Sequence, residues 1–339
     1  MARVPWVRAV PEIRRLIVRA PNWLGDVVLS LGAVRDLRRN FPGARIEVLA
    51  RPSVADLYRA LGEVDGVRLC PSFREGIAAA RGCDAAVLLP NSLGSALQVF
   101  LARVPERWGY ARDGRGLLLT RRARVPHEVS GVSEAYYSRA MLAGVGLKVS
   151  ATQDLSLRCP DEWRARGTEL LGAGGRWVGL NPGAAFGSAK RWPAERYAAL
   201  ADGLARQGGA RVVILGSSAD RPVADAIAAA MTAPARVLAG ETRLTDLVGV
   251  LAGLDLLVTN DSGPMHLAAA LGTPLVAVFG PTDWRETAPG GAACQVVREP
   301  VECSPCKLRE CPIDHRCMTR VEVERVLAAA QDLLKGAHP

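Results

Sequence analysis

Residues 259–274, TNDSGPMHLAAALGTP, combine polar groups with the start of a helix. The apolar run LDLLV before them predicts a strand, and Pro264 at a first helical position predicts a helix directly after the turn. Free N–H groups at such a helix start bind anions. Gly263 allows the backbone to approach a phosphate closely, and Ser262 and His266 add hydrogen-bond donors. The segment therefore predicts a phosphate site.

Asp261 does not fit a site that reads phosphate alone. A carboxylate beside an anion site has a purpose if it accepts hydrogen bonds from hydroxyl groups, which indicates a sugar attached to the phosphate. A helix that Asp261 or Ser262 merely caps, with His266 packed against the core, is the alternative interpretation.

A second motif, PGAAFGSAKRWP, places Lys190 at the end of a glycine-rich loop, just before a helix that opens at Pro193. It is not a P-loop, because Arg191 stands where Ser or Thr would follow the lysine. No G-x-G-x-x-G follows the first expected strand, and no D-x-D pair is present for a metal–diphosphate clamp. A cationic side chain and helix starts are therefore expected to stabilise the phosphates.

A third motif, APNWLGDVVLS, places Gly25 and Asp26 in the first strand-to-helix loop. Asp26 is the candidate general base. Its alternative role is that of a helix N-cap, and the two roles are compatible because N–H donors keep a carboxylate ionised.

The spacing of apolar runs predicts repeated strand–helix units in both halves, hence two parallel, doubly wound sheets of the α/β class. We expect domains at residues 1–160 and 161–320, followed by a packing helix at 320–339 that begins with a Thr319–Glu322 capping box. Ligands of such sheets lie outside the carboxyl ends of the strands, where all three motifs fall.

Charge is uneven along the chain. Residues 1–150 hold 23 Lys and Arg against 13 Asp and Glu, whereas residues 151–339 hold 20 against 21. This asymmetry indicates an anionic partner for the front half, unless it reflects an arginine-rich composition. Few aromatic residues accompany the arginines, which argues against nucleic acid. The absence of a long apolar run or an evident leader indicates a cytoplasmic protein.

Four segments, PNWLGDVVLS, VLLPNSLGSAL, PGAAFGSAKRWP and TNDSGPMHLAAALGTPLVAVFGPT, resemble in order the lipopolysaccharide heptosyltransferase family. The resemblance implies a GT-B fold, in which two Rossmann-like domains face each other across a cleft. It assigns the acceptor mainly to the front half and ADP-heptose to the back half.

Carried over residue by residue, the resemblance makes Asp26 the general base and Lys190 the group that neutralises the diphosphate. The donor-binding residues that it implies are Ser188, Lys190, Ser218, Thr242, Asp261, Ser262, Gly263 and His266. The acceptor-binding residues that it implies are Asn22, Asn91, Ser95 and Arg107.

The implied reaction is an inverting transfer of L-glycero-D-manno-heptose from ADP-heptose to the first heptose of the lipopolysaccharide inner core, without a required cofactor. The segment around Asn91 favours this acceptor over Kdo-lipid A, which remains an alternative. A sugar-nucleotide epimerase of the same fold and a nucleotide-binding regulator without chemistry are further alternatives. The acceptor is lipid-anchored, so peripheral contact with the cytoplasmic face of the inner membrane is expected. Arginines are then expected to form a basic face near the cleft: Arg103, Arg107, Arg112, Arg115, Arg121, Arg122 and Arg124.

Four of the eight cysteines are clustered: Cys303, Cys306, Cys311 and Cys317. Their spacing resembles a metal knuckle but lacks the longer central loop of common zinc sites. A structural zinc ion and free or disulfide-bonded thiols therefore stay open as alternatives.

Overall fold

The computed structural model describes residues 11–125, 134–289 and 293–336. The chain divides into two compact units, Met1–Leu155 (unit 1) and Ser156–Pro339 (unit 2). Each unit contains one six-stranded sheet in which all neighbouring strands are parallel. These are two Rossmann-like sheets, the pair of domains that makes up a GT-B fold.

The sheet of unit 1 has the strand order β3-β2-β1-β4-β5-β6. Its order reverses between β1 and β4, so the loops after these two strands flank the switch point where doubly wound sheets bind ligands. The strands are β1 (Arg15–Arg19), β2 (Arg45–Ala50), β3 (Gly66–Leu69), β4 (Ala85–Leu88), β5 (Glu106–Tyr110) and β6 (Arg121–Ala123).

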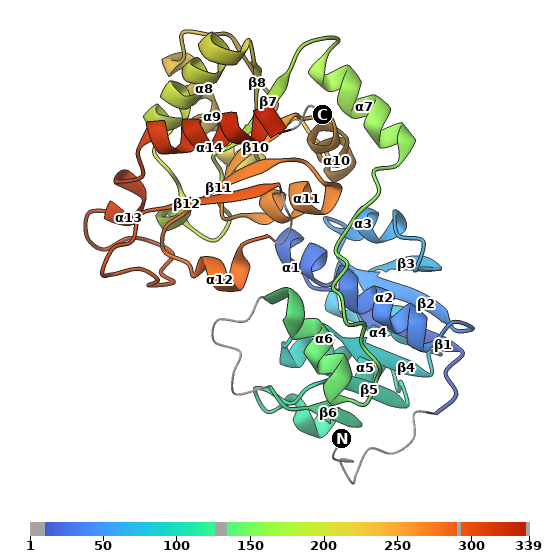
Figure 1. The fold of residues 1–339 in the computed structure, drawn as a ribbon. Helices are drawn as coiled ribbons and strands as arrows, with labels where there is room; N and C mark the ends of the chain where they lie inside the picture. Colours follow the sequence, from blue (N-terminus) through green and yellow to red (C-terminus); the bar gives the residue numbers. More distant parts are fainter. Residues whose placement is uncertain (1–10, 126–133, 290–292, 337–339) are drawn as a thin grey trace. The chain divides into compact units, whose positions relative to one another are not determined.

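Helices cover both faces of this sheet (Figure 1). Helix α6 packs against α1 and α2 on one face, and α5 packs against α4 and the short 3-10 helix η1 on the other. The helices of unit 1 are α1 (Leu24–Leu29), α2 (Leu31–Asn40), α3 (Ala55–Arg59), α4 (Phe73–Ala80), α5 (Leu93–Leu101), η1 (Arg115–Leu118) and α6 (Glu134–Gly144).

The sheet of unit 2 has the order β12-β11-β10-β7-β8-β9, which is the same topology. Its switch point lies between β7 and β10, whose partners include Leu180 and Val258. The strands are β7 (Trp177–Asn181), β8 (Arg211–Ile214), β9 (Ala235–Val237), β10 (Leu256–Asn260), β11 (Leu275–Phe279) and β12 (Cys294–Arg298).

In unit 2, α8 packs against α9 and α14, and on the other face α10 packs against α7 and α11 (Figure 1). The helices and 3-10 turns are α7 (Asp161–Leu171), η2 (Ser188–Lys190), α8 (Ala194–Gly208), η3 (Ser218–Asp220), α9 (Arg221–Ala230), α10 (Leu244–Ala252), α11 (Gly263–Leu271), α12 (Trp284–Thr287), α13 (Arg316–Thr319) and α14 (Val323–Gly336).

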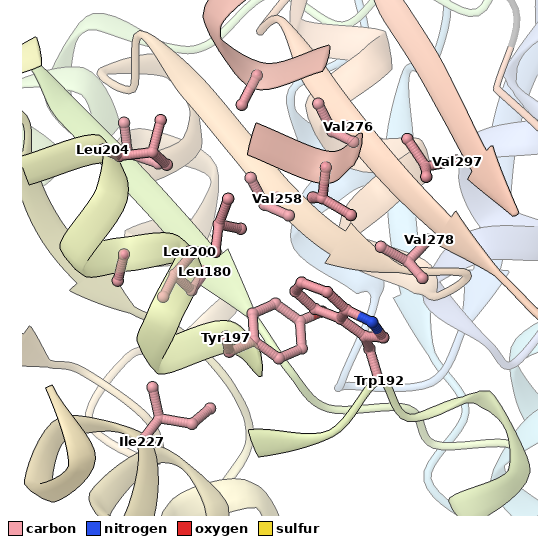
Figure 2. Packing of buried hydrophobic residues seen from close by; sticks show 14 of the residues in the cluster. Leu180, Trp192, Tyr197, Leu200, Leu204, Ile227, Val258, Val276, Val278 and Val297 are labelled. Carbon is pink, nitrogen blue, oxygen red and sulfur yellow. The ribbon is translucent and has the colours of Figure 1, made fainter. Parts of the chain in front are cut away.

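The core of unit 2 lies between its sheet and the α8–α9–α14 face (Figure 2). Strands β7 and β10 are buried along their whole length, as expected for central parallel strands covered on both faces. The rings of Trp192 and Tyr197 meet edge to face with their centroids 5.0 Å apart. This contact anchors the end of the loop that carries Lys190 to the core.

One expected boundary is wrong. The last helix begins at Val323, and Thr319 ends the short helix α13, where its hydroxyl donates to the backbone oxygen of His315. Thr319 and Glu322 therefore form no capping box at the start of α14. The expected apolar face of that helix is confirmed, since Val326, Ala330 and Leu334 are buried in the core.

Candidate functional site

The loops after β7 and β10 meet at the switch point of the second sheet and hold most of the expected donor residues. The loop after β7 runs to η2 and carries Ser188 and Lys190, and the loop after β10 carries Asp261 and Ser262. Because β7 and β10 are hydrogen-bonded neighbours, motifs nearly 70 residues apart in the sequence form one site.

Lys190 contacts Asp261 directly. The Nζ atom of Lys190 lies 2.6 Å from Oδ2 of Asp261, and the hydroxyl of Thr282 donates to the same oxygen at 2.6 Å. Both ion-pair partners are largely buried, with side-chain exposures of 12% and 5%. The site therefore contains one cation and one anion in hydrogen-bond contact, a pair that a ligand with phosphate and hydroxyl groups can separate and bind.

Thr282 is not among the site residues predicted from the sequence. Thr282 follows β11, the neighbour of β10 on the side away from β7, so its position at a carboxyl strand end was the available signal. A cavity of about 220 Å³ borders Thr282 and extends toward α12, with Trp284, Arg298 and Pro305 in its walls.

No side-chain cap blocks the N–H groups at the start of α11. Ser262 is the N-cap residue, but its side chain makes no capping bond, and Pro264 occupies the first turn. The hydroxyl of Ser262 instead lies 3.0 Å from Nδ2 of Asn181 and 3.1 Å from the hydroxyl of Thr259. The capping interpretation of Ser262 is thus wrong, and the helix start keeps its anion-binding groups.

Asn260 links the two loops from inside the core. Its Oδ1 accepts hydrogen bonds from the backbone N–H of Trp192 at 3.1 Å and from the hydroxyl of Tyr197 at 3.0 Å. Its Nδ2 donates to the backbone oxygen of Pro182 at 2.7 Å. One buried amide therefore holds both ends of the Lys190 loop against β10, at the residue before Asp261.

His266 is buried in the first turns of α11, and its surroundings keep it neutral. Desolvation lowers the pKa of its imidazole to about 4; the nearby Asp261 carboxylate opposes this shift and Lys190 adds to it. At neutral pH the ring therefore contributes a hydrogen-bond donor or acceptor, not a positive charge.

The Lys190 loop is held on its other side by the cysteine-rich segment. The backbone N–H of Ala189 donates to the backbone oxygen of Arg309 at 3.0 Å, and Nε2 of His315 lies 2.7 Å from the oxygen of Ala189. A Cβ on Gly187 would lie 2.1 Å from the Arg309 oxygen, so this approach requires glycine. The aromatic ring of Phe186 lies between Lys190 and Arg309, with centroid distances of 4.9 and 5.3 Å.

The four clustered cysteines are all free thiols. Cys317 is buried, and burial together with the neighbouring Cys303, Cys306 and Cys311 raises the pKa of its thiol to about 11. Across the described residues, no group of three or more His, Cys, Asp or Glu side chains is arranged to hold a metal ion.

Ser218 and Thr242 lie on two loops that touch, after β8 and β9. The backbone N–H of Gly240 donates to the oxygen of Gly216 at 3.0 Å, and a Cβ on Gly240 would lie 3.0 Å from Cα of Ser218. Gly240 has φ +78°, a conformation that side chains disfavour. Both hydroxyl-bearing residues are thus on the same edge of the sheet as Lys190.

Asp26 is the third residue of α1, whose N-cap is Trp23 and carries no side-chain cap. The N-cap alternative for Asp26 is therefore wrong. Among the described residues no side chain pairs with its carboxylate, which remains accessible to solvent, while the surrounding protein raises its pKa by desolvation. An unpaired carboxylate with a raised pKa is suited to accept a proton.

Asn22 and Asn91 follow the two switch-point strands of unit 1. Oδ1 of Asn22 accepts from Arg19 at 3.0 Å, and Nδ2 of Asn91 donates to the hydroxyl of Tyr137 at 2.8 Å. Ser95 is buried, and its hydroxyl donates to the backbone oxygen of Ser92 at 2.7 Å. These contacts give Ser95 a role in shaping the loop.

The expected continuous arginine face is only partly present. Arg115 is fully buried, where it donates to the backbone oxygens of Tyr110 and Pro90. Arg107 is half-buried and donates to the oxygens of Val104 and Leu118, and Arg121 lies 3.3 Å from Glu106. These three arginines organise the turns around η1, and the exposed ones are Arg103, Arg112, Arg122 and Arg124.

Comparison with known proteins identifies the family. A family model described as glycosyltransferase family 9 (heptosyltransferase) matches residues 77–316. The chain is 34% identical to lipopolysaccharide heptosyltransferase 2 of Salmonella typhimurium, over 84% of this chain and 88% of that protein. It is 32% identical to lipooligosaccharide heptosyltransferase 2 of Haemophilus influenzae, with the same coverage.

The solved structure of ADP-heptose lps heptosyltransferase II from E. coli superposes with a TM-score of 0.85 at 30% identity, covering 96% of this chain and all of that one. The chain therefore belongs to glycosyltransferase family 9, the heptosyltransferase family, and is a glycosyltransferase. Among the described residues, no helix has both the length and the apolar character needed to cross a bilayer.

Proposed function

We propose that this glycosyltransferase moves L-glycero-D-manno-heptose from ADP-heptose to the first heptose of the lipopolysaccharide inner core. The observation that carries the proposal is the Lys190–Asp261 pair beside the uncapped start of α11. The relatives named above support the choice of donor and acceptor.

On the donor side, Lys190 and the N–H groups of Ser262 and Gly263 bind the diphosphate. Lys190 exchanges its contact with Asp261 for phosphate oxygens, and the released carboxylate accepts hydrogen bonds from heptose hydroxyls. The same cation and helix start stabilise the negative charge that grows on the leaving ADP. Ser188 and the neutral His266 add hydrogen bonds, and Ser218 and Thr242 contact the nucleoside.

Asp26 serves as the general base. It takes the proton from the attacking hydroxyl while that oxygen bonds to the anomeric carbon from the face opposite ADP, so the configuration inverts. Asn22 and Asn91 orient the acceptor sugar at the switch point of the first sheet. Arg107 and Ser95 support that site through the backbone of the surrounding turns.

The test is acceptor-dependent release of ADP, followed by NMR of the purified product. Transfer predicts ADP release only when a heptose-terminated core is present, and a product linkage opposite in anomeric configuration to the donor. Epimerisation of ADP-heptose without acceptor would contradict the proposal and favour the epimerase alternative. Retention of configuration would exclude direct attack assisted by Asp26.

A lipid-anchored acceptor requires the protein to work at the cytoplasmic face of the inner membrane. We infer peripheral association with that surface; the net positive charge of the front half supports it. Nucleic acid is not part of this proposal.

The reaction proposed here needs no cofactor. A zinc ion at Cys303, Cys306, Cys311 and Cys317 would stabilise the fold and take no part in the reaction. The thiols of Cys303, Cys306 and Cys311 are near enough to influence Cys317, but the described residues show no arrangement of three ligands for a metal ion. Elemental analysis of protein purified without chelator decides between about one zinc per chain and free thiols.

A further inference from the structure

Helix α5 has an apolar face on each side. Its inner face, which includes Ala96 and Val99, is buried against the sheet of unit 1. Its other side carries large apolar residues at helical spacing, called here the α5 outer face: the exposed Leu93, Phe100 and Leu101 and the half-buried Leu97. Residues 93–101 contain no charged side chain, so this helix lacks the polar face that a water-facing surface helix normally has.

The apolar surface continues beyond the helix. The 3-10 helix η1 packs against α5 and carries Leu117, whose side chain is 85% exposed. Helix α4 packs on the neighbouring side and begins with the exposed Phe73. By contrast, the accessible positions of α2 on the opposite face of the sheet are all polar: Arg35, Arg38, Arg39 and Asn40.

Exposed arginines lie beside this surface. Residues 89–125 contain seven arginines and two acids, Glu106 and Asp113, and four of these arginines are exposed. Arg103 directly follows α5 with φ +58°, a conformation in which glycine is preferred, and Arg122 lies against η1. Neither Arg103 nor Arg122 forms an ion pair within the described part of the chain. Arg107 stacks on Phe100 with its guanidinium carbon 5.4 Å from the ring centroid.

We propose that the α5 outer face and Leu117 insert into the interface of an anionic lipid bilayer, with Arg103 and Arg122 contacting the headgroups. Apolar side chains that enter the acyl boundary beside unpaired cations are the pattern of interfacial membrane binding. This inference rests on the proposed function, whose acceptor is lipid-anchored, and it names the surface that would approach the bilayer. A second copy of this chain would bury the leucines but would bring together Arg103 and Arg122, which have no ion-pair partner among the described residues, and this disfavours it.

The experiment measures binding of the full chain to vesicles, without donor or acceptor, so its result is independent of the proposed reaction. Vesicles of phosphatidylcholine alone are compared with vesicles that also contain phosphatidylglycerol. We expect binding to the anionic vesicles, weakened by salt. Leu101→Gln/Leu117→Gln should lower the partition coefficient about tenfold or more, because two apolar side chains no longer enter the interface. Leu308→Gln/Ile313→Gln, an exposed apolar pair in unit 2, should leave it unchanged.

Charge is tested separately. Arg103→Gln/Arg122→Gln should lower the partition coefficient about tenfold and reduce its salt dependence, whereas Arg206→Gln/Arg320→Gln in unit 2 should not. The leucine variant should keep transfer to a deacylated, water-soluble acceptor and lose transfer to the same acceptor embedded in vesicles. Equal vesicle binding by wild type and leucine variant would overturn the proposal. So would a wild-type dimer that the leucine variant dissociates, since the face would then be an interface between copies.

Discussion

At the scale of single residues, the ion pair between Lys190 and Asp261 is the central contact of the candidate site in unit 2. Lys190 lies 2.6 Å from a carboxylate that Thr282 also contacts, so the lysine is held in position before any ligand binds. In the proposed donor site, the gain from holding this long side chain nearby is offset by the ion pair that must be broken when the diphosphate binds.

Lys190→Ala should weaken ADP binding about 10- to 100-fold and slow transfer as well. The variant removes a charged hydrogen bond and leaves Asp261 to repel the diphosphate. Isothermal calorimetry with ADP measures the first effect, with Lys335→Ala as an exposed control in the same unit. Unchanged ADP affinity in Lys190→Ala would remove this residue from the donor site.

Asp26→Asn should lower turnover by roughly 10²–10⁴ while leaving ADP affinity intact, because general base catalysis typically supplies that much. Since desolvation raises the pKa of this carboxyl, the wild-type rate should rise with pH through a pKa above the ordinary aspartate range. Asp56→Asn in α3, where the half-buried carboxylate pairs with Arg59, is the control. Wild-type turnover in Asp26→Asn would exclude a base at this position.

His266 should make stability depend on pH. Its folded-state pKa of about 4 lies below the usual 6.5, so the unfolded chain binds more protons between these values. The free energy of unfolding should therefore fall by about 2 kcal/mol from about pH 7 to about pH 5 through this residue. Urea denaturation of wild type and His266→Gln measures the difference. An equal loss in both proteins would show that His266 does not cause it.

The polar residues of the candidate site could be predicted from the sequence, but the residues that hold them in place could not. Asp261, Ser262 and Lys190 follow strand-end patterns that are visible in the chain. Thr282 offers only its position after a strand, and neither its role nor that of Asn260 is visible in the chain, because these roles depend on which strands are neighbours and on contacts with residues far along the chain. The buried Arg115 was mistaken for surface charge for the same reason.

At the scale of elements, α7 and α10 approach so closely that only glycine fits between them. A Cβ on Gly249 would lie 1.8 Å from the backbone oxygen of Trp163, and one on Gly167 would lie 2.1 Å from the carbonyl carbon of Gly249. Helix α7 is the first helix of unit 2, and this contact fixes it against α10.

Gly249→Ala should lower the free energy of unfolding by about 3 kcal/mol or more, because the added methyl group must separate two packed backbones. Gly208→Ala at the end of α8 meets no atom within 4 Å and should be neutral or stabilising by up to about 1 kcal/mol. Chemical denaturation of both variants tests this. Equal stability of the two would mean that α7 shifts without cost.

The alternation of strands and helices was predictable because apolar runs bounded by glycine and proline mark central strands such as β2, β7 and β10. The edge strands β3, β6 and β12 carry arginines or half-buried residues. They therefore lack the apolar run that predicts a central strand. The start of α14 was misplaced because a Thr-x-x-Glu pattern also fits the turn that separates α13 from α14.

At the scale of the whole molecule, the division of labour between two similar sheets explains the division of charge. Unit 1 carries the excess of arginine together with the apolar α5 outer face, and unit 2 carries the Lys190–Asp261 site. Two copies of one topology thus differ mainly in what their strand-end loops and outer helices present. A lipid-linked acceptor and a soluble nucleotide sugar are substrates that match this difference.

The most direct test offers the enzyme ADP-heptose with two core acceptors, one ending in Kdo and one ending in a single heptose, and weighs the products. We predict that only the heptose-terminated acceptor gains mass, by one heptose per molecule, with an equal amount of ADP released. Elongation of the Kdo-terminated acceptor instead, or no gain in mass for either acceptor, would contradict the account.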